Sequence, residues 1–156
     1  MKKAFSIMGL LVMAMMWIFS YGADSTLAAT YDRTDPIATG CARDAITVRS
    51  SSINSYGVIE LRYSPSCKTA WGKIILNFPS NYNVVGGKYG DAHIVRNSDG
   101  LSYGCTVPVG SKSCYTLQVN DNKVTSYAQG TISRVDKIWN GGWSATGIAI
   151  RRTGSY

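Results

Sequence analysis

The sequence predicts an all-β protein, a single small antiparallel β-sandwich or barrel with two disulfides that follows a cleaved N-terminal signal peptide. After residue 30, apolar and polar residues alternate with a period of two, which is typical of strands with one buried face. No stretch there shows helical apolar spacing over three turns, and clusters of Gly, Asn and Asp separate the alternating segments. The length of 156 residues suits one domain, and 45% hydrophobic with 16% charged residues argues against a disordered chain.

The first 29 residues have the order of a signal peptide. Met-Lys-Lys at residues 1–3 is followed by an uncharged apolar run over residues 4–21, and small residues then permit cleavage after Ala28 or Ala29. The alternative is an uncleaved membrane anchor, because a run of about 18 apolar residues reaches the lower limit of a spanning helix. We favour cleavage, which leaves residues 30–156 as a secreted, extracellular β-domain without an integral membrane span. No cysteine near the cleavage region points to a lipid anchor.

The predicted elements follow in chain order. Residues 32–45 form an irregular arm or a short helical turn, tied to the body through Cys41. About eight strands are predicted, over residues 46–49, 59–64, 70–76, 92–96, 101–107, 115–119, 127–132 and 145–151. Turn residues lie between them at 54–57, 85–88, 97–100, 120–122 and 140–142.

An even number of cysteines in an exported chain predicts disulfides. Cys41, Cys67, Cys105 and Cys114 allow three connectivities, and the sequence alone cannot select one, although the spacing favours Cys41–Cys67 and Cys105–Cys114. The second pair brackets a loop centred on residues 108–110, as expected of a bridged loop between two antiparallel strands. Zinc ligation is disfavoured because no two cysteines lie two to four residues apart and the chain has one His. We predict no metal and no cofactor.

Two blocks carry a family resemblance. Residues 35–45, Asp-Pro-Ile-Ala-Thr-Gly-Cys-Ala-Arg-Asp-Ala, and residues 60–71, Glu-Leu-Arg-Tyr-Ser-Pro-Ser-Cys-Lys-Thr-Ala-Trp, resemble the domain of unknown function 2690 family of small secreted Gram-positive bacterial proteins. The resemblance implies an extracellular location and a fold class, and it identifies no catalytic residues. Each block holds one cysteine, which suits the pairing of Cys41 with Cys67. We expect Tyr63 and Trp71 to contribute apolar area to the core.

Glu60, Arg62 and His93 are the candidate catalytic residues. They would supply a base, a cationic stabiliser and an acid, the set that a small secreted hydrolase or ribonuclease requires on a β-sheet. The alternative is that Glu60 and Arg62 form a surface ion pair with no catalytic role. We favour this structural interpretation.

Trp139 and Trp143 flank a predicted reversal and are candidate ligand-binding residues, since two exposed indoles can stack on sugar rings. We favour the alternative, in which the two indoles face each other across the hairpin and close the core. Segments 97–100 and 120–122 resemble fragments of calcium loops but lack the spaced carboxylates of a complete one, so we interpret them as turns.

The formal net charge of +7 becomes +6 after cleavage, with 14 basic and eight acidic residues remaining once Lys2, Lys3 and Asp24 are removed. Charge of this sign favours anionic partners outside a cell, such as wall teichoic acids or a phospholipid surface, with free nucleic acid less favoured. The alternative is a distributed charge that maintains solubility. The cations that would form a basic face are Arg33, Arg43, Arg49, Arg62, Lys68, Lys73, Arg151 and Arg152.

The leading functional hypothesis is therefore a secreted, disulfide-bonded, non-catalytic domain that binds at the anionic cell envelope. A small hydrolase or ribonuclease using Glu60, Arg62 and His93 is the first alternative. An antagonistic or inhibitory protein is the second. The sequence leaves the ligand and the oligomeric state open.

Overall fold

The computed structural model describes residues 30–156, and within them nine strands form two antiparallel sheets. The predicted signal peptide, residues 1–29, lies outside the described residues. The elements are η2 (Cys41–Arg43), β1 (Ile46–Ser52), β2 (Gly57–Ser64), β3 (Thr69–Leu76), β4 (Lys88–Arg96), β5 (Ser102–Thr106), β6 (Ser113–Tyr115), β7 (Val119–Asn120), β8 (Ser126–Trp139) and β9 (Gly142–Arg152).

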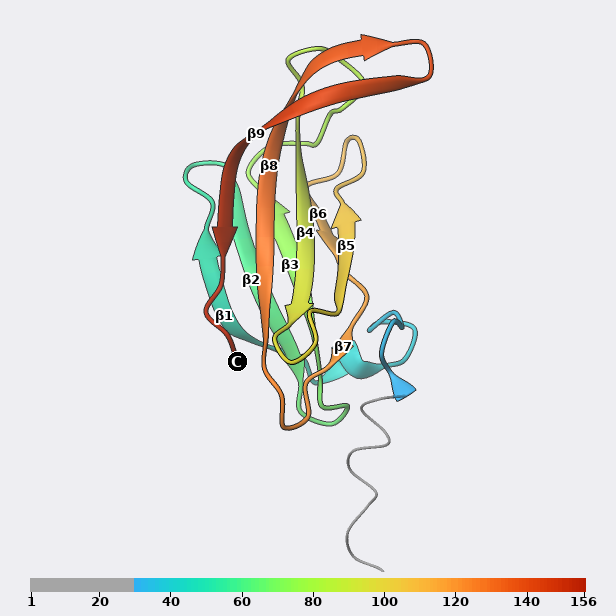
Figure 1. The fold of residues 1–156 in the computed structure, drawn as a ribbon, viewed down its shortest axis with the longest axis vertical. Helices are drawn as coiled ribbons and strands as arrows, with labels where there is room; N and C mark the ends of the chain where they lie inside the picture. The colour runs from blue at the N-terminus through green and yellow to red at the C-terminus, as the bar shows by residue number, and fades with distance from the viewer. Residues whose placement is uncertain (1–29) are drawn as a thin grey trace, which may run out of the picture.

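The two sheets pack face to face as a β-sandwich, which confirms the predicted all-β class (Figure 1). The first sheet has the order β1-β2-β3-β6, with β7 also paired to β3, and the second has the order β5-β4-β8-β9. Each observed strand overlaps a predicted one. The described residues contain no helix long and apolar enough to cross a membrane.

The core lies between the sheets and follows the period of two. Ile59 and Ile74 from the first sheet meet Ile94 and Ile132 from the second, and all four side chains are fully buried. Gly72 in β3 brings the layers close together, because a Cβ there would lie 3.2 Å from the carbonyl oxygen of His93. The alternation places the opposite face of each sheet toward solvent.

Two disulfides have the pairing that the spacing favours. Cys41–Cys67 joins η2 to the turn between β2 and β3, and Cys105–Cys114 joins β5 to β6 across a Cα–Cα distance of 6.2 Å. The predicted loop lies between the bridged cysteines, but β5 and β6 are edge strands of different sheets and do not pair with each other. The chain crosses between the layers over residues 107–112, so this disulfide joins the layers at one side.

The strand predicted over residues 115–119 is interrupted. It divides into β6 and β7, and residues 116–118 between them belong to neither strand. Thr116 and Gln118 are buried polar residues, and the backbone N–H of Gln118 donates to the carbonyl of Thr34 instead of to a strand of the sheet. Pairing with the arm therefore replaces pairing within the sheet at Gln118, whereas the backbone N–H of Thr116 still donates to the Gly72 carbonyl of β3.

The C-terminal residues complete the second sheet. The backbone groups of Tyr156 and Ser126 exchange two hydrogen bonds of 3.1 Å, and the Tyr156 ring packs on Tyr63 with centroids 5.0 Å apart. Asp121 is 6% exposed and accepts a 2.6 Å hydrogen bond from the Ser126 hydroxyl. Burial raises the pKa of Asp121 to about 6, although the Ser126 hydrogen bond and the Arg96 charge oppose this shift.

We predict that the Cys105→Ala/Cys114→Ala double variant is less stable to unfolding by about 2–4 kcal/mol, because the unfolded chain loses a covalent constraint. Denaturant titration of the oxidised protein of residues 30–156, which contains both sheets, both disulfides and the whole core, measures this difference. Equal midpoints for the variant and the oxidised wild type would contradict the proposed role of this disulfide.

The raised pKa of Asp121 predicts that the free energy of unfolding depends on pH. Its folded pKa of about 6 lies above the usual value of 3.8 for an aspartate, so the folded state binds this proton more tightly than the unfolded state. The contribution of Asp121 to the free energy of unfolding therefore falls as the pH rises from about 4 to about 6. Asp121→Asn retains an acceptor for Ser126 and does not ionise, so its stability relative to wild type should rise by about 1–2 kcal/mol over that range. A stability difference that is independent of pH from 4 to 6 would refute this.

Candidate functional site

An N-terminal arm, residues 32–45, covers part of the outer face of the first sheet. Gln118 holds it in place: its buried side-chain amide donates to the hydroxyls of Thr34 at 2.8 Å and Thr39 at 3.0 Å. The amide oxygen accepts a 2.6 Å hydrogen bond from Thr69 of β3. Both ends of one side chain therefore connect the arm to the sheet, which confirms the irregular, Cys41-tethered arm predicted from the sequence.

Carboxylates fix the two ends of the arm. Asp32 lies 2.9 Å from Arg96, which also contacts Asp99 at 2.6 Å, and the hydrogen bond from Arg96 lowers the pKa of Asp99 to about 2. At the other end, Asp44 accepts hydrogen bonds from the Ser64 hydroxyl at 2.6 Å and the Ser66 amide at 2.8 Å. These hydrogen bonds, chiefly that of Ser64, hold the pKa of Asp44 below its usual value.

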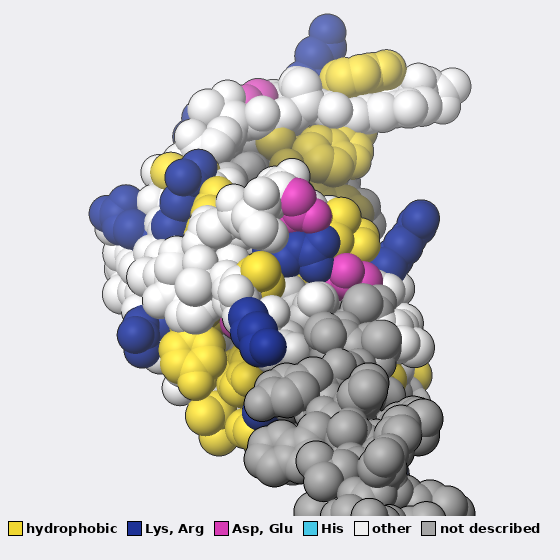
Figure 2. All heavy atoms as spheres, turned by 60° about the horizontal axis from the view of Figure 1, so that its bottom comes forward, with side chains coloured by type: hydrophobic (Ala, Val, Ile, Leu, Met, Phe, Trp, Pro, Cys, Tyr) yellow, Lys and Arg dark blue, Asp and Glu magenta, His cyan; other side chains and the backbone are white. Residues whose placement is uncertain are grey.

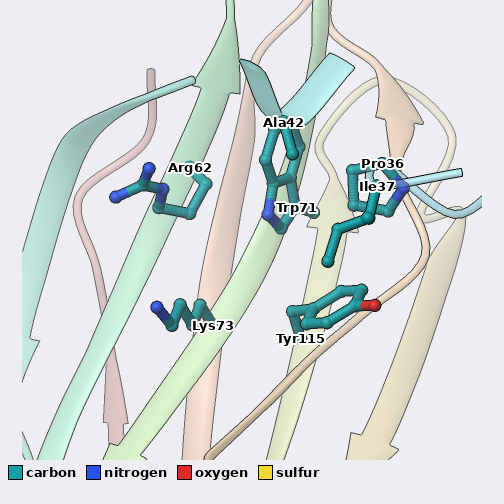
Figure 3. A pocket seen from close by; sticks show the side chains of 7 residues that line it. All are labelled: Pro36, Ile37, Ala42, Arg62, Trp71, Lys73 and Tyr115. Atoms are coloured by element: carbon teal, nitrogen blue, oxygen red, sulfur yellow. The ribbon is translucent and has the colours of Figure 1, made fainter. Parts of the chain in front are cut away.

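Trp71 lies beneath this arm. It alternates with the inward-facing Ala70 and Gly72, so its indole extends from the outer face of β3, yet it is only 3% exposed. Figure 3 shows the indole below Ala42, with its nitrogen edge toward Arg62 and Lys73. The expectation that Trp71 contributes to the core between the sheets is therefore wrong, because the arm buries it instead. Tyr63, by contrast, packs against the inter-sheet core as expected.

The arm and the sheet enclose a small pocket, which we call the arm pocket. It has a volume of about 130 Å³ and is lined by Pro36, Ile37, Ala42, Arg62, Trp71, Lys73 and Tyr115 (Figure 3). Enclosed sites for whole small molecules typically measure about 300–1,000 Å³. The arm pocket is thus suited to one group that projects from a larger ligand.

Three hydrogen-bond donors lie around the pocket. Arg62 is held by hydrogen bonds to the Thr47 hydroxyl at 2.7 Å and the Ala45 carbonyl at 3.0 Å. Within residues 30–156, the ammonium of Lys73 and the indole N–H of Trp71 make no hydrogen bond to protein. Because no buried side-chain polar atom of the described residues lacks a partner, the Trp71 N–H reaches the pocket surface.

Tyr115 completes the pocket beside Lys73, its partner in the β3–β6 register. Its hydroxyl donates to the Asp35 carboxylate at 3.3 Å, while burial and the Asp35 charge raise the pKa of the phenol. Tyr115 is therefore protonated, is 37% exposed, and borders the pocket on the side away from Arg62 (Figure 3). Cations beside aromatic rings are suited to an anionic group carried on a sugar or polyol.

The structure separates the predicted catalytic residues. Glu60 and Arg62 lie together on the outer face of β2, 3.7 Å apart, as an ion pair. His93 belongs to β4 of the other sheet and is exposed on its outer face, beside Gly104 and Gln129. The sandwich core therefore lies between His93 and the Glu60–Arg62 pair, and one substrate bond cannot contact all three groups.

The two hairpin tryptophans do not close the core. Trp139 is 50% exposed and Trp143 is 41% exposed, and the register pairs Trp139 with Gly142 and Trp143 with Ile138. Neighbouring pairs of a hairpin point to opposite faces, so the indoles do not face each other and the favoured interpretation is wrong. The extended β8 and β9 carry them beyond the sandwich (Figure 1).

The two C-terminal arginines do not share one face. Arg151 contacts Asn54 at 2.8 Å, whereas Arg152 bonds to Gln129 on the outer face of the second sheet. Figure 2 likewise shows Lys and Arg side chains at separate places on the face in view. The candidate calcium fragments have structural partners, Arg96 for Asp99 and Ser126 for Asp121. Among residues 30–156 no cluster of three or more metal-ligating side chains exists.

Sequence reasoning identified Arg62 and Lys73 as cations but missed their grouping with Trp71 and Tyr115. The alternation in β3 could have indicated part of this grouping, because Trp71 and Lys73 are two residues apart and therefore share a face of the strand. Nothing in the sequence indicated that the arm covers this face.

Comparison with known proteins gives two matches. The model of a family described as a protein of unknown function (DUF2690) matches residues 29–129, a range that includes every residue of the arm pocket. The uncharacterized protein YjfA of Bacillus subtilis (strain 168) is 35% identical over 148 residues, which cover 85% of this chain and 92% of YjfA. No solved structure matches the chain.

Proposed function

Because the chain belongs to the DUF2690 family of proteins of unknown function, we propose its function from the arm pocket: it is a secreted, non-catalytic domain that binds anionic polymers of the cell envelope. The pocket receives one anionic group of the polymer, a phosphodiester or carboxylate. Further groups along the polymer interact with the cations outside the pocket.

Secretion is supported by the two disulfides, which persist in an oxidising environment. The signal-peptide pattern in residues 1–29 agrees with this location. The formal charge of +6 on residues 30–156 favours association with anionic wall polymers through salt-sensitive attraction.

One observation carries the proposal: Lys73 and the indole N–H of Trp71 are donors without a partner among residues 30–156, and both border the same pocket as Arg62. A guanidinium and an ammonium can bind one phosphate or carboxylate through charge-assisted hydrogen bonds. Arg62 is preorganised by the Ala45 carbonyl and Thr47, so little side-chain entropy is lost when the anion binds.

The hydrolase alternative is less well supported, because Glu60 and Arg62 lie on one sheet and His93 on the outer face of the other. General acid–base catalysis requires both proton-transfer groups within hydrogen-bond reach of the reacting atoms. No observation specifically favours an antagonistic or inhibitory role.

The test is retention of the oxidised protein of residues 30–156 on purified cell walls, with Lys73→Gln as the variant and Lys123→Gln as its control. Lys123 is exposed between β7 and β8 and does not line the pocket. We predict that Lys73→Gln weakens binding about threefold to tenfold, since one charge-assisted contact is lost, and that Lys123→Gln changes it less than twofold. Salt and chemical removal of the wall anions should both release the wild-type protein. Retention that resists both treatments, or equal retention of the two variants, would refute the proposal.

A further inference from the structure

The distal hairpin, residues 134–146 of β8 and β9, extends past the end of the sandwich (Figure 1). Its strands are paired with each other up to Trp139 and Gly142, and Gly141 at the turn has φ 93°, which favours glycine. Two register shifts, between Ile132 and Ser133 and between Val135 and Lys137, interrupt the regular pairing of β8 with β9. This segment lies outside the range of the family match and outside the arm pocket.

The hairpin exposes aromatic and aliphatic side chains on both of its faces. One face carries Trp143, which stacks on Tyr82 with centroids 5.9 Å apart and meets Tyr89 edge-on at 5.2 Å. The other face carries Trp139. Ile138, Trp139 and Trp143 are 39%, 50% and 41% exposed.

The neighbouring loop adds apolar surface at the same end of the molecule. Its Gly86 donates a backbone hydrogen bond to Val135 of β8, which places Val84 and Val85 beside the base of the hairpin. Val84 is 49% exposed and Val85 is 63% exposed. Exposed apolar groups are common singly, whereas a cluster at one projecting end indicates contact with an apolar medium or partner.

Three cations border this cluster. Lys137 lies 6.0 Å from the centre of the Trp139 ring, and Lys88 and Arg134 are partners in the β4–β8 register at the hairpin base. Asp136 is the acidic residue of the hairpin, and Arg134 lies 3.6 Å from it. This end of the molecule therefore combines exposed apolar side chains with neighbouring cationic side chains.

We infer that the distal hairpin binds the surface of an anionic lipid bilayer, with its tryptophans at headgroup level and its cations toward the lipid phosphates. Trp and Tyr favour this interface because their rings are amphipathic, and Lys and Arg can extend toward water from apolar surroundings. Anionic headgroups attract cationic side chains that lie close to the membrane surface.

The charge of the hairpin favours an anionic bilayer over a protein partner. Trp143 packs on Tyr82 and Tyr89 of the body, whereas the opposite face places the exposed Trp139 ring beside the ammonium of Lys137. An amphipathic ring next to a cation suits the headgroup region of an anionic bilayer. This inference goes beyond the proposed function, since it concerns another surface and another class of ligand.

The test is co-sedimentation of the oxidised protein of residues 30–156 with vesicles of phosphatidylglycerol and phosphatidylcholine, compared with vesicles of phosphatidylcholine alone. We expect binding to the anionic vesicles, weakened by salt, with a blue shift of tryptophan emission as the exposed indoles leave water. Trp139→Ala should reduce partitioning about tenfold, because it removes one interfacial ring. Lys137→Gln should reduce it about twofold to fivefold.

Ile150→Ser is the matched control, since Ile150 is 51% exposed on β9 outside the hairpin and its substitution should leave partitioning unchanged. Far-UV circular dichroism of each variant verifies that the fold is retained. Three results would overturn the inference: no binding to the anionic vesicles at low salt, equal binding of Trp139→Ala and wild type, or concentration-dependent self-association that Trp139→Ala removes. Wall retention by the arm pocket is independent of all three results.

Discussion

The buried amide of Gln118 is the interaction on which the proposed site depends. Its two N–H groups donate to Thr34 and Thr39 of the arm, and its oxygen accepts from Thr69 of the sheet. The arm cannot move away without breaking both donated hydrogen bonds, each of which contributes about 0.5–1.5 kcal/mol net to stability. The Cys41–Cys67 disulfide holds the other part of the arm covalently. The arm is consequently fixed over Trp71, and the pocket is formed before any ligand arrives.

This constraint also explains why Trp71 differs from an ordinary surface tryptophan. The arm removes its ring from water, while the indole N–H remains accessible beside Lys73. The Ala45 carbonyl, at the end of the same arm, positions the guanidinium of Arg62. Fold and site are therefore coupled through the arm, since the segment that covers an apolar side chain also orients a cation. Such preorganisation strengthens anion binding because less freedom is lost on association.

The sequence predicted the strands and both disulfide pairs, because a period of two and cysteine spacing are local signals. It did not predict the break between β6 and β7, since Tyr115, Leu117 and Val119 alternate as a strand would. Gln118 leaves the sheet only because the folded arm offers it partners, and that contact spans 84 residues from Thr34. The position of Trp71 depends on the same contact. The hairpin tryptophans were misplaced for another reason: β8 and β9 extend well beyond the predicted segments, so the turn lies far from the core.

We propose that the arm pocket is the primary site for the anionic polymer and that the cations outside it add only weaker contacts. A nuclear magnetic resonance titration of the oxidised protein of residues 30–156 with a soluble glycerol-phosphate oligomer tests it most directly. We expect the indole N–H signal of Trp71 and the backbone amide signals of Lys73 and Tyr115 to shift together, to saturate, and to return on addition of salt, while the indole signals of Trp139 and Trp143 stay in place. Weak, unsaturated shifts spread over Arg33, Arg49 and Arg151, with the Trp71 signal unchanged, would contradict it.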